Sequence, residues 1–444
     1  MAEIFPFRAH RYNSTRVELA RVLTQPYDKI TPAMQERYYA LDPYNLIRIE
    51  KGRERPGDTP ENNVYTRAAR ALEEWIERGV LARDPTPAIY LYFQSYQVPH
   101  ARARKVRKGF IALGRVEDYF AGVVFRHEQT LAGPKADRLE LLRYTRAHTG
   151  QLFMLYEDPR RRVDALLERA SRAPTPVEVR DEYGVVHRLW PVADPKLIER
   201  LQREMTNKKL VIADGHHRYE TALAYRNECR ARLGTTDPDA PHEKVMMTFF
   251  NTHAEGITIL PTHRVVSNLR GFRLEQFRKR LEPYFELSSY RFSRKASRGA
   301  RYREFRKDLG SRMRNRRAIG LYAGRGALHM LLLKREARLA SLLPDVSPAQ
   351  RELDVVLLHR LILEKGLGIT PEAVVAERNI SYEREMDAAF AAVDRGKAQL
   401  CLLLNPVRID QVMRVALSGE VLPQKSTDFY PKLLSGLALY RLEP

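Results

Sequence analysis

The sequence predicts an α+β protein. Short apolar runs of strand length are mixed with amphipathic segments of helical spacing, and no strand-helix-strand repeat runs along the chain. Of the 444 residues, 44% are hydrophobic and 30% are charged, which is typical of a folded globular chain. A chain of this length usually divides into two or three domains. We expect a first portion over residues 1–265 and a second α+β portion over residues 266–444, with the loop 423–432 returning to the first.

The first 80 residues predict two helices between shorter elements. Residues 22–30 are typical of a strand interrupted by a Pro-Tyr-Asp turn, and residues 46–50 alternate as a strand. A helix is expected over residues 32–41. The apolar face of residues 63–78 predicts a longer helix, with Gly79 at its end.

The rest of the chain continues this mixture. Alternating apolar residues predict two paired strands, at 89–93 and 110–116. Further strands are expected at 152–156, 210–213, 246–250, 257–260, 318–322 and 329–333, and further helices at 139–144 and 353–365.

Composition excludes several classes of protein. No segment approaches the roughly 18 uninterrupted apolar residues of a membrane helix, and the N-terminus lacks the pattern of a secretory signal. Cys229 and Cys401 have no metal-ligand spacing and do not indicate a disulfide scaffold. We therefore expect a cytoplasmic protein that does not bind membranes, in an oligomeric state that the sequence leaves open.

The charge balance raises the alternative of nucleic-acid binding. The formal net charge is +21, and much of the excess lies in the segment 291–318. Phe305, Leu309 and Met313 have helical spacing there, and arginine is frequent elsewhere in the chain. A solvated basic helix is therefore favoured over a nucleic-acid arm.

Residues 209–220 concentrate the chemistry of the chain. The apolar run 210–213 is too short for a helix and predicts a buried strand. Asp214 is then expected to cap a helix that ends at Gly234. A strand that enters a helix through Asp-Gly-His-His-Arg directs backbone N–H groups, imidazoles and a guanidinium at one point. Such a point favours an anion, most readily phosphate.

Two simpler interpretations of this motif are weaker. His216 and His217 point about 100° apart on a helix, so they do not form the one-faced zinc pair of histidines four residues apart. The second interpretation is that the motif is only the polar start of a helix, without a function. It does not explain why four polar side chains lie at one junction.

A second cluster, residues 126–130, follows an apolar run and precedes the charged residues 134–138. Glu128 could act as a general base or hold a metal ion, because a carboxylate beside cations stays ionised. The alternative is a surface strand end with a satisfied ion pair.

Three other segments are weaker signals. Residues 261–264, Pro-Thr-His-Arg, end a strand with a hydroxyl, an imidazole and a guanidinium, whereas residues 26–28 are most simply a turn. The loop 422–432 carries two lysines, two hydroxyls and an aromatic pair between prolines. It could contact phosphates or be a Pro-bounded surface loop.

Together the motifs resemble a large bacterial and archaeal family known as domain of unknown function 1015. The matching segments appear in the family's order and cover nearly the whole chain: 26–28, 127–130, 213–219, 261–264 and 423–427. Gln25 departs from the family, which usually has a second proline there.

The Asp-Gly-His-His-Arg element also resembles the phosphate-binding motif of the ParB and sulfiredoxin superfamily. That resemblance implies a ParB/sulfiredoxin-like, nucleotide-binding fold for residues 1–265. One branch of the superfamily comprises free serine kinases, so the implied activity is phosphorylation of a small hydroxyl-bearing amino acid, with L-serine the leading candidate. ATP or ADP would be the phosphoryl donor, together with Mg²⁺.

The same resemblance implies roles for individual residues. Glu128 or Asp214 would accept the hydroxyl proton or hold Mg²⁺, and His217 would join them as a catalytic residue. The phosphates would be held by Gly215, His216, Arg218, His127, Thr130, His263, Arg264, Lys425, Ser426 and Thr427. Two other classes stay open, namely a nucleic-acid-binding ParB-like protein and a metal-dependent phosphoester hydrolase.

Overall fold

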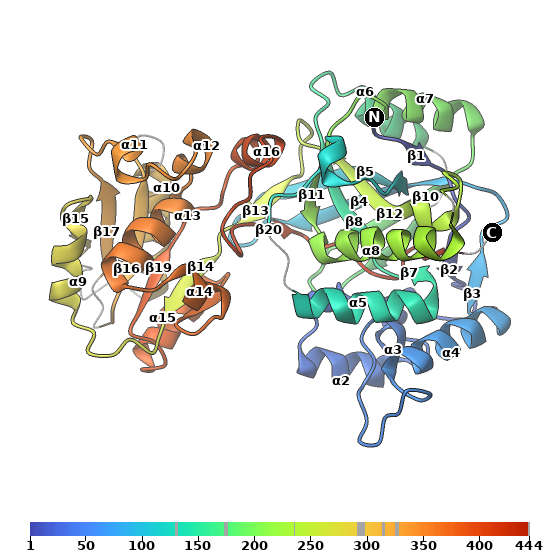
Figure 1. Cartoon of the computed structure of the whole chain (residues 1–444), viewed down its shortest axis with the longest axis horizontal. Helices are drawn as coiled ribbons and strands as arrows, with labels where there is room; N and C mark the ends of the chain where they lie inside the picture. The colour runs from blue at the N-terminus through green and yellow to red at the C-terminus, as the bar shows by residue number, and fades with distance from the viewer. Residues whose placement is uncertain are drawn as a thin grey trace. The chain divides into compact units, whose positions relative to one another are not determined.

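A computed structural model describes residues 1–128, 132–172, 176–234, 236–290, 298–312, 316–324 and 328–442. Its architecture is mixed α+β, which confirms the predicted fold class. The described residues form two compact units, shown in Figure 1. Unit 1 contains the described residues of 1–126, 130–258 and 431–444, and unit 2 contains those of 127–129 and 259–430. The division into folding domains at residue 265 stays a prediction.

Unit 1 is built on a mixed sheet. Strands β6 and β11 are parallel, as are β8 and β12, and the other neighbours in this sheet are antiparallel. In spatial order the strands are β6 (Val124–Phe125), β11 (Leu210–Asp214), β8 (Leu152–Tyr156), β12 (Lys244–Asn251), β5 (Arg104–Arg115), β4 (Ile89–Gln97), β10 (Val186–Val192) and β9 (Val177–Arg180), and β1 (Ile4–Phe5) also pairs with β5. Two smaller pairs join β2 (His10–Tyr12) to β3 (Leu81–Arg83) and β7 (Ala147–His148) to β21 (Tyr440–Arg441).

The helices of unit 1 include a layered group. Figure 1 shows α5 beside α8, with α4 on the other side of α5. The helices are α1 (Leu19–Val22), α2 (Pro32–Leu41), α3 (Ile47–Glu50), α4 (Val64–Glu77), α5 (Ala132–Thr145), α6 (Arg162–Ala170), α7 (Pro195–Met205) and α8 (His216–Leu233), with 3₁₀ turns η1 (Tyr27–Lys29), η2 (Tyr119–Ala121) and η3 (Pro241–Glu243).

The predicted helices near residues 32–41 and 63–78 are confirmed as α2 and α4. The strand predicted at 46–50 is wrong, because this segment forms the short helix α3. Ile47 and Glu50 are both buried, and residues three apart share one face of a helix but not of a strand. The strand predicted over 22–30 is also wrong, since α1 ends at Val22 and η1 follows.

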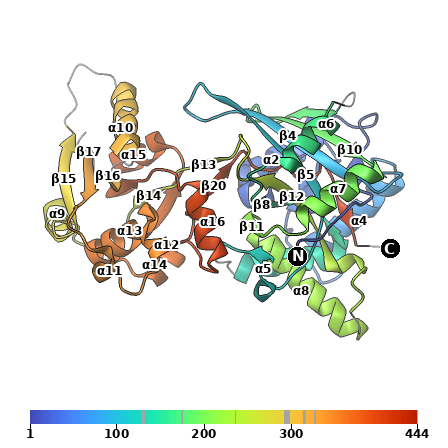
Figure 2. The same cartoon turned by 90° about the horizontal axis from the view of Figure 1, so that it is seen from above.

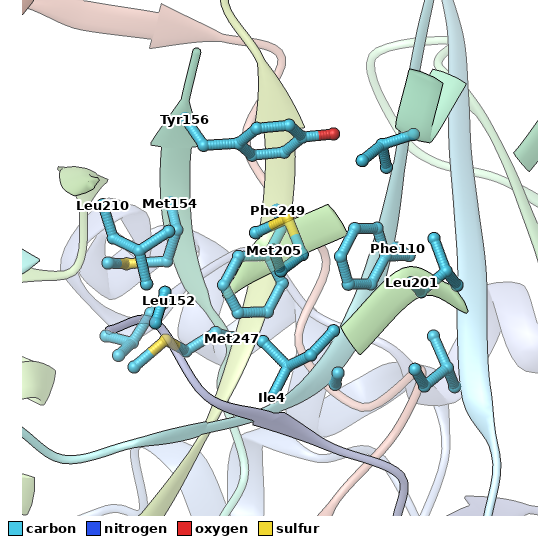
Figure 3. Close-up of a cluster of buried hydrophobic side chains, with 14 of the residues drawn as sticks. Ile4, Phe110, Leu152, Met154, Tyr156, Leu201, Met205, Leu210, Met247 and Phe249 are labelled. Carbon is cyan, nitrogen blue, oxygen red and sulfur yellow. The ribbon is translucent and has the colours of Figure 1, made fainter. Parts of the chain in front are cut away.

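The apolar core of unit 1 lies against one face of this sheet. Figure 3 shows side chains from β5, β8, β11 and β12 meeting Leu201 and Met205 of α7. The rings of Phe110 and Phe249 lie with their centroids 5.0 Å apart. This packing fixes the strand β11, which leads directly into the Asp-Gly-His-His-Arg motif of residues 214–218.

Unit 2 contains an antiparallel sheet. Its strands, in spatial order, are β15 (Phe285–Tyr290), β17 (Leu328–Leu333), β16 (Ala318–Tyr322), β19 (Leu400–Leu403), β14 (His263–Val266) and β18 (Ile380–Glu383). Helices α10 (Arg298–Arg312) and α15 (Met386–Asp394) lie on one face of the sheet (Figure 2). The other elements are β13 (Thr258–Leu260), α9 (Leu274–Leu281), α11 (Leu339–Leu342), α12 (Pro348–Arg351), α13 (Asp354–Leu357), the π-helix η4 (Leu358–Gly366), α14 (Pro371–Val375), α16 (Ile409–Leu417) and β20 (Asp428–Tyr430).

Within the basic segment 291–318, residues 298–312 form helix α10, as the helical spacing predicted. Phe305 and Leu309 of α10 are buried in the core of unit 2, and Asp308 pairs with Arg312 at 2.9 Å. Met313 lies outside the described residues. The helix predicted at 353–365 is present but continues as a π-helix from Leu358.

The cysteines and the apolar character of the helices complete the description of the fold. Cys229 and Cys401 are both free thiols. Among the helices of the described residues, none has the length and apolar character to span a bilayer.

Candidate functional site

The central motif lies where β11 passes into α8. Ile212 pairs with Met154 and Asp214 with Phe153, so Ala213 is an extra residue that bulges the strand just before the motif. The helix begins at His216 and ends before Gly234, as predicted. The prediction that Asp214 caps this helix is wrong, because the N-cap residue is Gly215 and no side chain caps it.

Glycine is required at position 215 for two reasons. Its φ is +96°, a left-handed conformation that L side chains rarely adopt. A Cβ there would lie 3.0 Å from Leu152 Cδ2 and 3.1 Å from Arg218 Nε. Glycine therefore lets Leu152 and Arg218 pack against the N-terminal end of α8, which carries the partial positive charge of the helix dipole.

Cations surround the carboxylate of Asp214. Lys432 Nζ lies 3.5 Å from Asp214 Oδ2, and Arg218 Nη2 lies 4.0 Å from the same oxygen. Burial opposes ionisation of this carboxyl, but the charges of Lys432, Arg218, Lys29 and His216 outweigh it and hold the pKa of Asp214 well below its usual range. Asp214 is therefore ionised at neutral pH, and a carboxylate this acidic is a weak proton acceptor.

The guanidinium of Arg218 is held by a backbone carbonyl and has an N–H donor that is not used. Its Nη1 donates to the Gln151 carbonyl. A Cβ on Gly150 would lie 3.0 Å from that same nitrogen, so glycine leaves the guanidinium room. The buried Nε of Arg218 has no hydrogen-bond partner among the described residues. A guanidinium with an unused donor is suited to an incoming oxyanion.

A buried polar network fixes the backbone on either side of Lys432. Arg107, which is 1% exposed, donates to the Pro431 carbonyl at 2.5 Å and to Gln94 Oε1 at 2.9 Å. Gln94 Nε2 in turn donates to the Lys432 carbonyl at 2.8 Å. Burial lowers the pKa of Arg107 to about 10, which still leaves it charged at neutral pH. The network thus orients Lys432 toward Asp214 without using the lysine side chain.

The second cluster, built around His127 and Glu128, belongs to unit 2. His127 Nε2 and Thr427 Oγ1 are 2.8 Å apart, and the His127 carbonyl accepts the Leu422 N–H at 2.8 Å. Glu128 Oε1 accepts the Lys425 N–H at 3.3 Å. The loop 422–427 is therefore folded onto His127 and Glu128, with Lys425 in the left-handed region at φ +55°.

His263 and Arg264 support this loop from the buried strand β14. His263 Nδ1 accepts the Leu404 N–H at 3.2 Å, and burial with the charges of Arg306 and Arg264 lowers the pKa of His263 to about 3, so the imidazole is neutral. Arg264 Nη2 donates to the Gln424 carbonyl at 3.1 Å. Burial also lowers the pKa of Arg264, to about 10.

The structure places the predicted site residues in two groups. Residues 214–218 lie together in unit 1, where His217 is half-buried in the first turn of α8. His127, Glu128, His263, Arg264, Lys425, Ser426 and Thr427 lie in unit 2. Ser426 is buried and donates its hydroxyl to the Pro423 carbonyl. Thr130 lies outside the described residues.

Sequence reasoning missed two cations beside Asp214, namely Lys29 and Lys432. Lys432 had a usable signal, because it is the second lysine of the Pro-bounded loop at 422–432. Lys29 directly follows the Pro-Tyr-Asp segment at 26–28, which local sequence explains as a turn. Both are brought to Asp214 by contacts between segments distant in sequence.

Within the part of the chain that the structure describes, no three His, Cys, Asp or Glu side chains gather to hold a metal ion. Mg²⁺ in nucleotide enzymes is commonly bound by one or two carboxylates together with substrate phosphates. Asp214 and Glu128 are the two candidate carboxylates for such a role, and Asp214 is paired with Lys432 and Arg218.

The sequence matches a recognised protein family. The family model described as "Protein of unknown function (DUF1015)" matches residues 4–356. The chain belongs to this family. None of the curated proteins matches this sequence.

Several solved structures are similar to this chain. A conserved hypothetical protein from Pyrococcus furiosus is 12% identical with a TM-score of 0.33, over 71% of this chain and 92% of that chain. A free serine kinase in complex with AMP is 11% identical with a TM-score of 0.34, over 71% of this chain and 88% of that chain. A C-terminally truncated SbnI from Staphylococcus aureus is 12% identical with a TM-score of 0.33, over 74% and 87%.

Proposed function

We propose that this protein is a nucleotide-dependent phosphotransferase that phosphorylates the hydroxyl of a small amino acid, with free L-serine as the first candidate. The observation that carries the proposal is the junction of β11 and α8. There an uncapped helix N-terminus, Arg218 and Lys432 surround one ionised carboxylate. The sequence resemblance to the ParB and sulfiredoxin superfamily supports a nucleotide phosphate as the anion. On the same basis we propose a ParB/sulfiredoxin-like fold for residues 1–265.

The balance of charge favours a phosphate over a simple carboxylate ligand. Lys432, Arg218, Lys29 and His216 all act on Asp214, so several cations share this one carboxylate. A multiply charged phosphate would use these cations, together with the helix dipole. Gly215 and Gly150 let Arg218 lie close to the backbone at the start of α8, where a side chain on either glycine would crowd the guanidinium.

We assign the general base to Glu128 rather than to Asp214. The low pKa of Asp214 makes it a poor proton acceptor, so its role is to orient Lys432 and Arg218. In the proposed step Glu128 takes the proton of the serine hydroxyl while the oxygen forms a bond to the terminal phosphorus. The bond from that phosphorus to the bridging oxygen breaks, releasing ADP from ATP or AMP from ADP. His217 is proposed to contact the transferred group.

Mg²⁺ is proposed as the metal cofactor. When bound, it would neutralise charge on the phosphate oxygens. Asp214, the other candidate carboxylate, is proposed to hold it together with the substrate phosphates, because Glu128 is already assigned as the base.

The test is incubation of the full-length protein with ATP or ADP, Mg²⁺ and a mixture of free amino acids, followed by mass spectrometry. Formation of a phosphoamino acid supports the proposal. Free phosphate alone would identify a hydrolase, and absence of nucleotide binding at millimolar concentration would overturn the kinase assignment. Retention of nucleic acid with a steep salt dependence would favour the ParB-like binding alternative.

Glu128→Gln tests the assigned base. We expect turnover to fall by about 10²- to 10⁴-fold while nucleotide affinity changes little, because the amide cannot accept the proton. The matched control is Glu282→Gln, which changes an exposed carboxylate in the same unit. Normal turnover in Glu128→Gln would remove Glu128 from the mechanism.

A further inference from the structure

A pocket of about 340 Å³ lies within unit 1, and none of its lining residues belongs to α8. It is lined by the turn at Tyr27 and by residues of α2, α3, α4 and α5. Two features of the sequence meet here that the proposed phosphate site does not use. These are the Pro-Tyr-Asp segment at 26–28 and the charged run at 134–138, which contribute Tyr27, Asp137 and Arg138.

The walls of the pocket carry charges of both signs. Lys51 and Arg138 supply cations, and Glu50, Glu54 and Asp137 supply carboxylates. Around Asp214, by contrast, Lys432, Arg218, Lys29 and His216 act on the same carboxylate. A phosphate would meet repulsion from the three carboxylates of the pocket, whereas a ligand with one positive and one negative group would find a partner for each.

The cationic side is held in place with donors to spare. Arg138 Nη1 donates to the Glu50 carbonyl at 2.7 Å. Its Nε and Nη2 donate to the carboxylate of Asp137 at 2.9 and 2.7 Å. The guanidinium lies 4.3 Å from the centre of the Tyr27 ring. These bonds use three of the five guanidinium N–H groups.

Lys51 completes this side. Its Nζ donates to the carbonyls of Tyr27 at 3.3 Å and Ile30 at 2.7 Å, which accounts for two of the three ammonium protons. Partial burial, together with the charge of Arg138, lowers the pKa of Lys51. A ligand carboxylate shared by Lys51 and Arg138 would relieve the repulsion between them.

The acidic side offers acceptors for an ammonium group. Glu54 is exposed and has no ion-pair partner among the residues that the structure describes. Asp137 Oδ1 accepts the Tyr65 hydroxyl at 3.0 Å, which orients its carboxylate. Ile49 and Val64 add apolar surface between the charged groups.

We infer that this pocket binds the zwitterionic head group of a free α-amino acid, with the carboxylate on Lys51 and Arg138 and the ammonium on the acidic wall. Glu50 and Arg138 also line a smaller cavity of about 40 Å³ that reaches Gly150 and Arg218. The pocket therefore adjoins the Arg218 side of the phosphate site. Assignment of the bound amino acid as the phosphoryl acceptor rests on the proposed function; binding itself does not.

The experiment is equilibrium binding to the full-length protein by calorimetry, without nucleotide and again with AMP. L-serine is compared with serinol, which lacks the carboxylate, and with 3-hydroxypropionate, which lacks the ammonium. A small panel of other free amino acids is included. We expect a free amino acid to bind, and each analogue that lacks one charge to bind at least about tenfold more weakly.

Variants then locate the site. Lys51→Met and Glu54→Gln should each weaken amino-acid binding by about tenfold while AMP affinity stays within about twofold of the parent. Lys196→Met and Glu199→Gln, both exposed on α7, are the matched controls and should change neither.

Three outcomes would overturn the inference. No amino acid binds up to millimolar concentration, or both variants bind the amino acid with normal affinity. The third is that the variants lose affinity for AMP and keep their affinity for the amino acid. The last would identify the pocket as a nucleoside site. Amino-acid binding without any phosphoamino acid product would retain the pocket and overturn the proposed function, so the two failures are distinguishable.

Discussion

At the scale of single residues, the proposed phosphate site depends on one lysine whose position is set by buried neighbours. Lys432 makes its ion pair with Asp214 through Nζ, while Arg107 and Gln94 hold the carbonyls of Pro431 and Lys432. Charge and position therefore have separate structural origins. A substitution of the lysine side chain removes the charge and leaves the supporting hydrogen bonds intact.

Lys432→Met should weaken binding of ADP or ATP by about tenfold or more, because a charge-assisted hydrogen bond to a phosphate is worth about 1.5–3 kcal/mol. Folding should be preserved, since the network contacts only the backbone here. Isothermal titration calorimetry measures the affinity, and Lys196→Met on the exposed surface of α7 serves as the control. Equal nucleotide affinity in both variants would exclude Lys432 from the phosphate site.

His263 gives a second prediction at this scale, concerning acid stability. Its pKa is lowered to about 3 in the folded protein, and an unfolded histidine titrates near 6.5. Below about pH 6.5 the unfolded chain therefore binds a proton that the folded chain does not, and stability falls as pH falls. Between pH 6.5 and pH 5 this group costs about 2 kcal/mol.

His263→Asn keeps a side-chain acceptor for the Leu404 N–H but does not titrate. Urea unfolding at pH 7 and pH 5 should show a smaller loss of stability in the variant by about 2 kcal/mol. An identical pH dependence in the two proteins would show that His263 becomes protonated in the folded state.

The sequence showed which polar residues cluster along the chain, but not their structural details. Residues 214–218 and the 425–427 loop were recognisable because several polar groups of complementary chemistry lie close together in the chain. The capping role of Asp214 was wrong, since the neighbouring glycine adopts the left-handed conformation and the carboxylate turns to Lys432 and Arg218. Lys29 and Lys432 were missed because their proximity to Asp214 depends on folding of distant segments.

At the scale of elements, the start of α8 is defined by a glycine whose replacement has two separable consequences. Gly215→Ala introduces both left-handed strain and contacts at 3.0 and 3.1 Å with Leu152 and Arg218. Gly234, at the other end of the same helix, has φ +67°, and no atom lies within 4 Å of the position that an alanine Cβ would take there. Comparison of the two alanine variants therefore separates the effect of left-handed backbone strain from the effect of displacing Leu152 and Arg218.

We expect Gly234→Ala to cost about 1 kcal/mol and to leave nucleotide affinity unchanged. Gly215→Ala should cost about 2 kcal/mol or more and reduce nucleotide affinity at least about tenfold, because Leu152 and Arg218 must move. Thermal denaturation and calorimetry measure the two effects. Unchanged affinity in Gly215→Ala would argue against phosphate binding at this helix start.

Elements with a clear period were predictable, and short ones were not. Helix α4 and the β4–β5 pair follow from apolar spacing over many residues. The segment 46–50 is too short for its period to decide, and the burial of Glu50 depends on its bond with Thr149. The bulge at Ala213 likewise has no local signal, since it reflects the pairing of β11 with β8.

At the scale of the whole molecule, the chain leaves unit 1 after Thr258 and rejoins it at Pro431. This return brings Lys432 to Asp214 and adds β21 beside β7. Local sequence does not show which unit a terminal segment joins, because Leu433, Leu434 and Leu439 would be buried equally well in either core. The loop at 422–432 was recognisable by its composition. That its last residues belong to unit 1 could not be predicted from the sequence.

Truncation after Tyr430 should therefore unfold unit 1 rather than merely shorten unit 2. The removed segment buries Leu433, Leu434, Leu437 and Leu439, each at most 5% exposed. Burial of one leucine contributes about 1.5–3 kcal/mol, so the loss approaches the roughly 5–15 kcal/mol that stabilises a whole domain. It also removes the Pro431 and Lys432 carbonyls, which leaves the buried Arg107 and Gln94 without these acceptors.

Circular dichroism, limited proteolysis and AMP binding test this prediction on the truncated chain. We expect early cleavage within residues 1–258 and loss of AMP binding. Leu439→Ala in the full chain is the graded comparison, expected to cost about 2–5 kcal/mol while leaving Lys432 in place. A truncated protein that resists proteolysis as the parent does would show that unit 1 folds without its C-terminal segment; Lys432→Met then becomes the decisive test of the phosphate site.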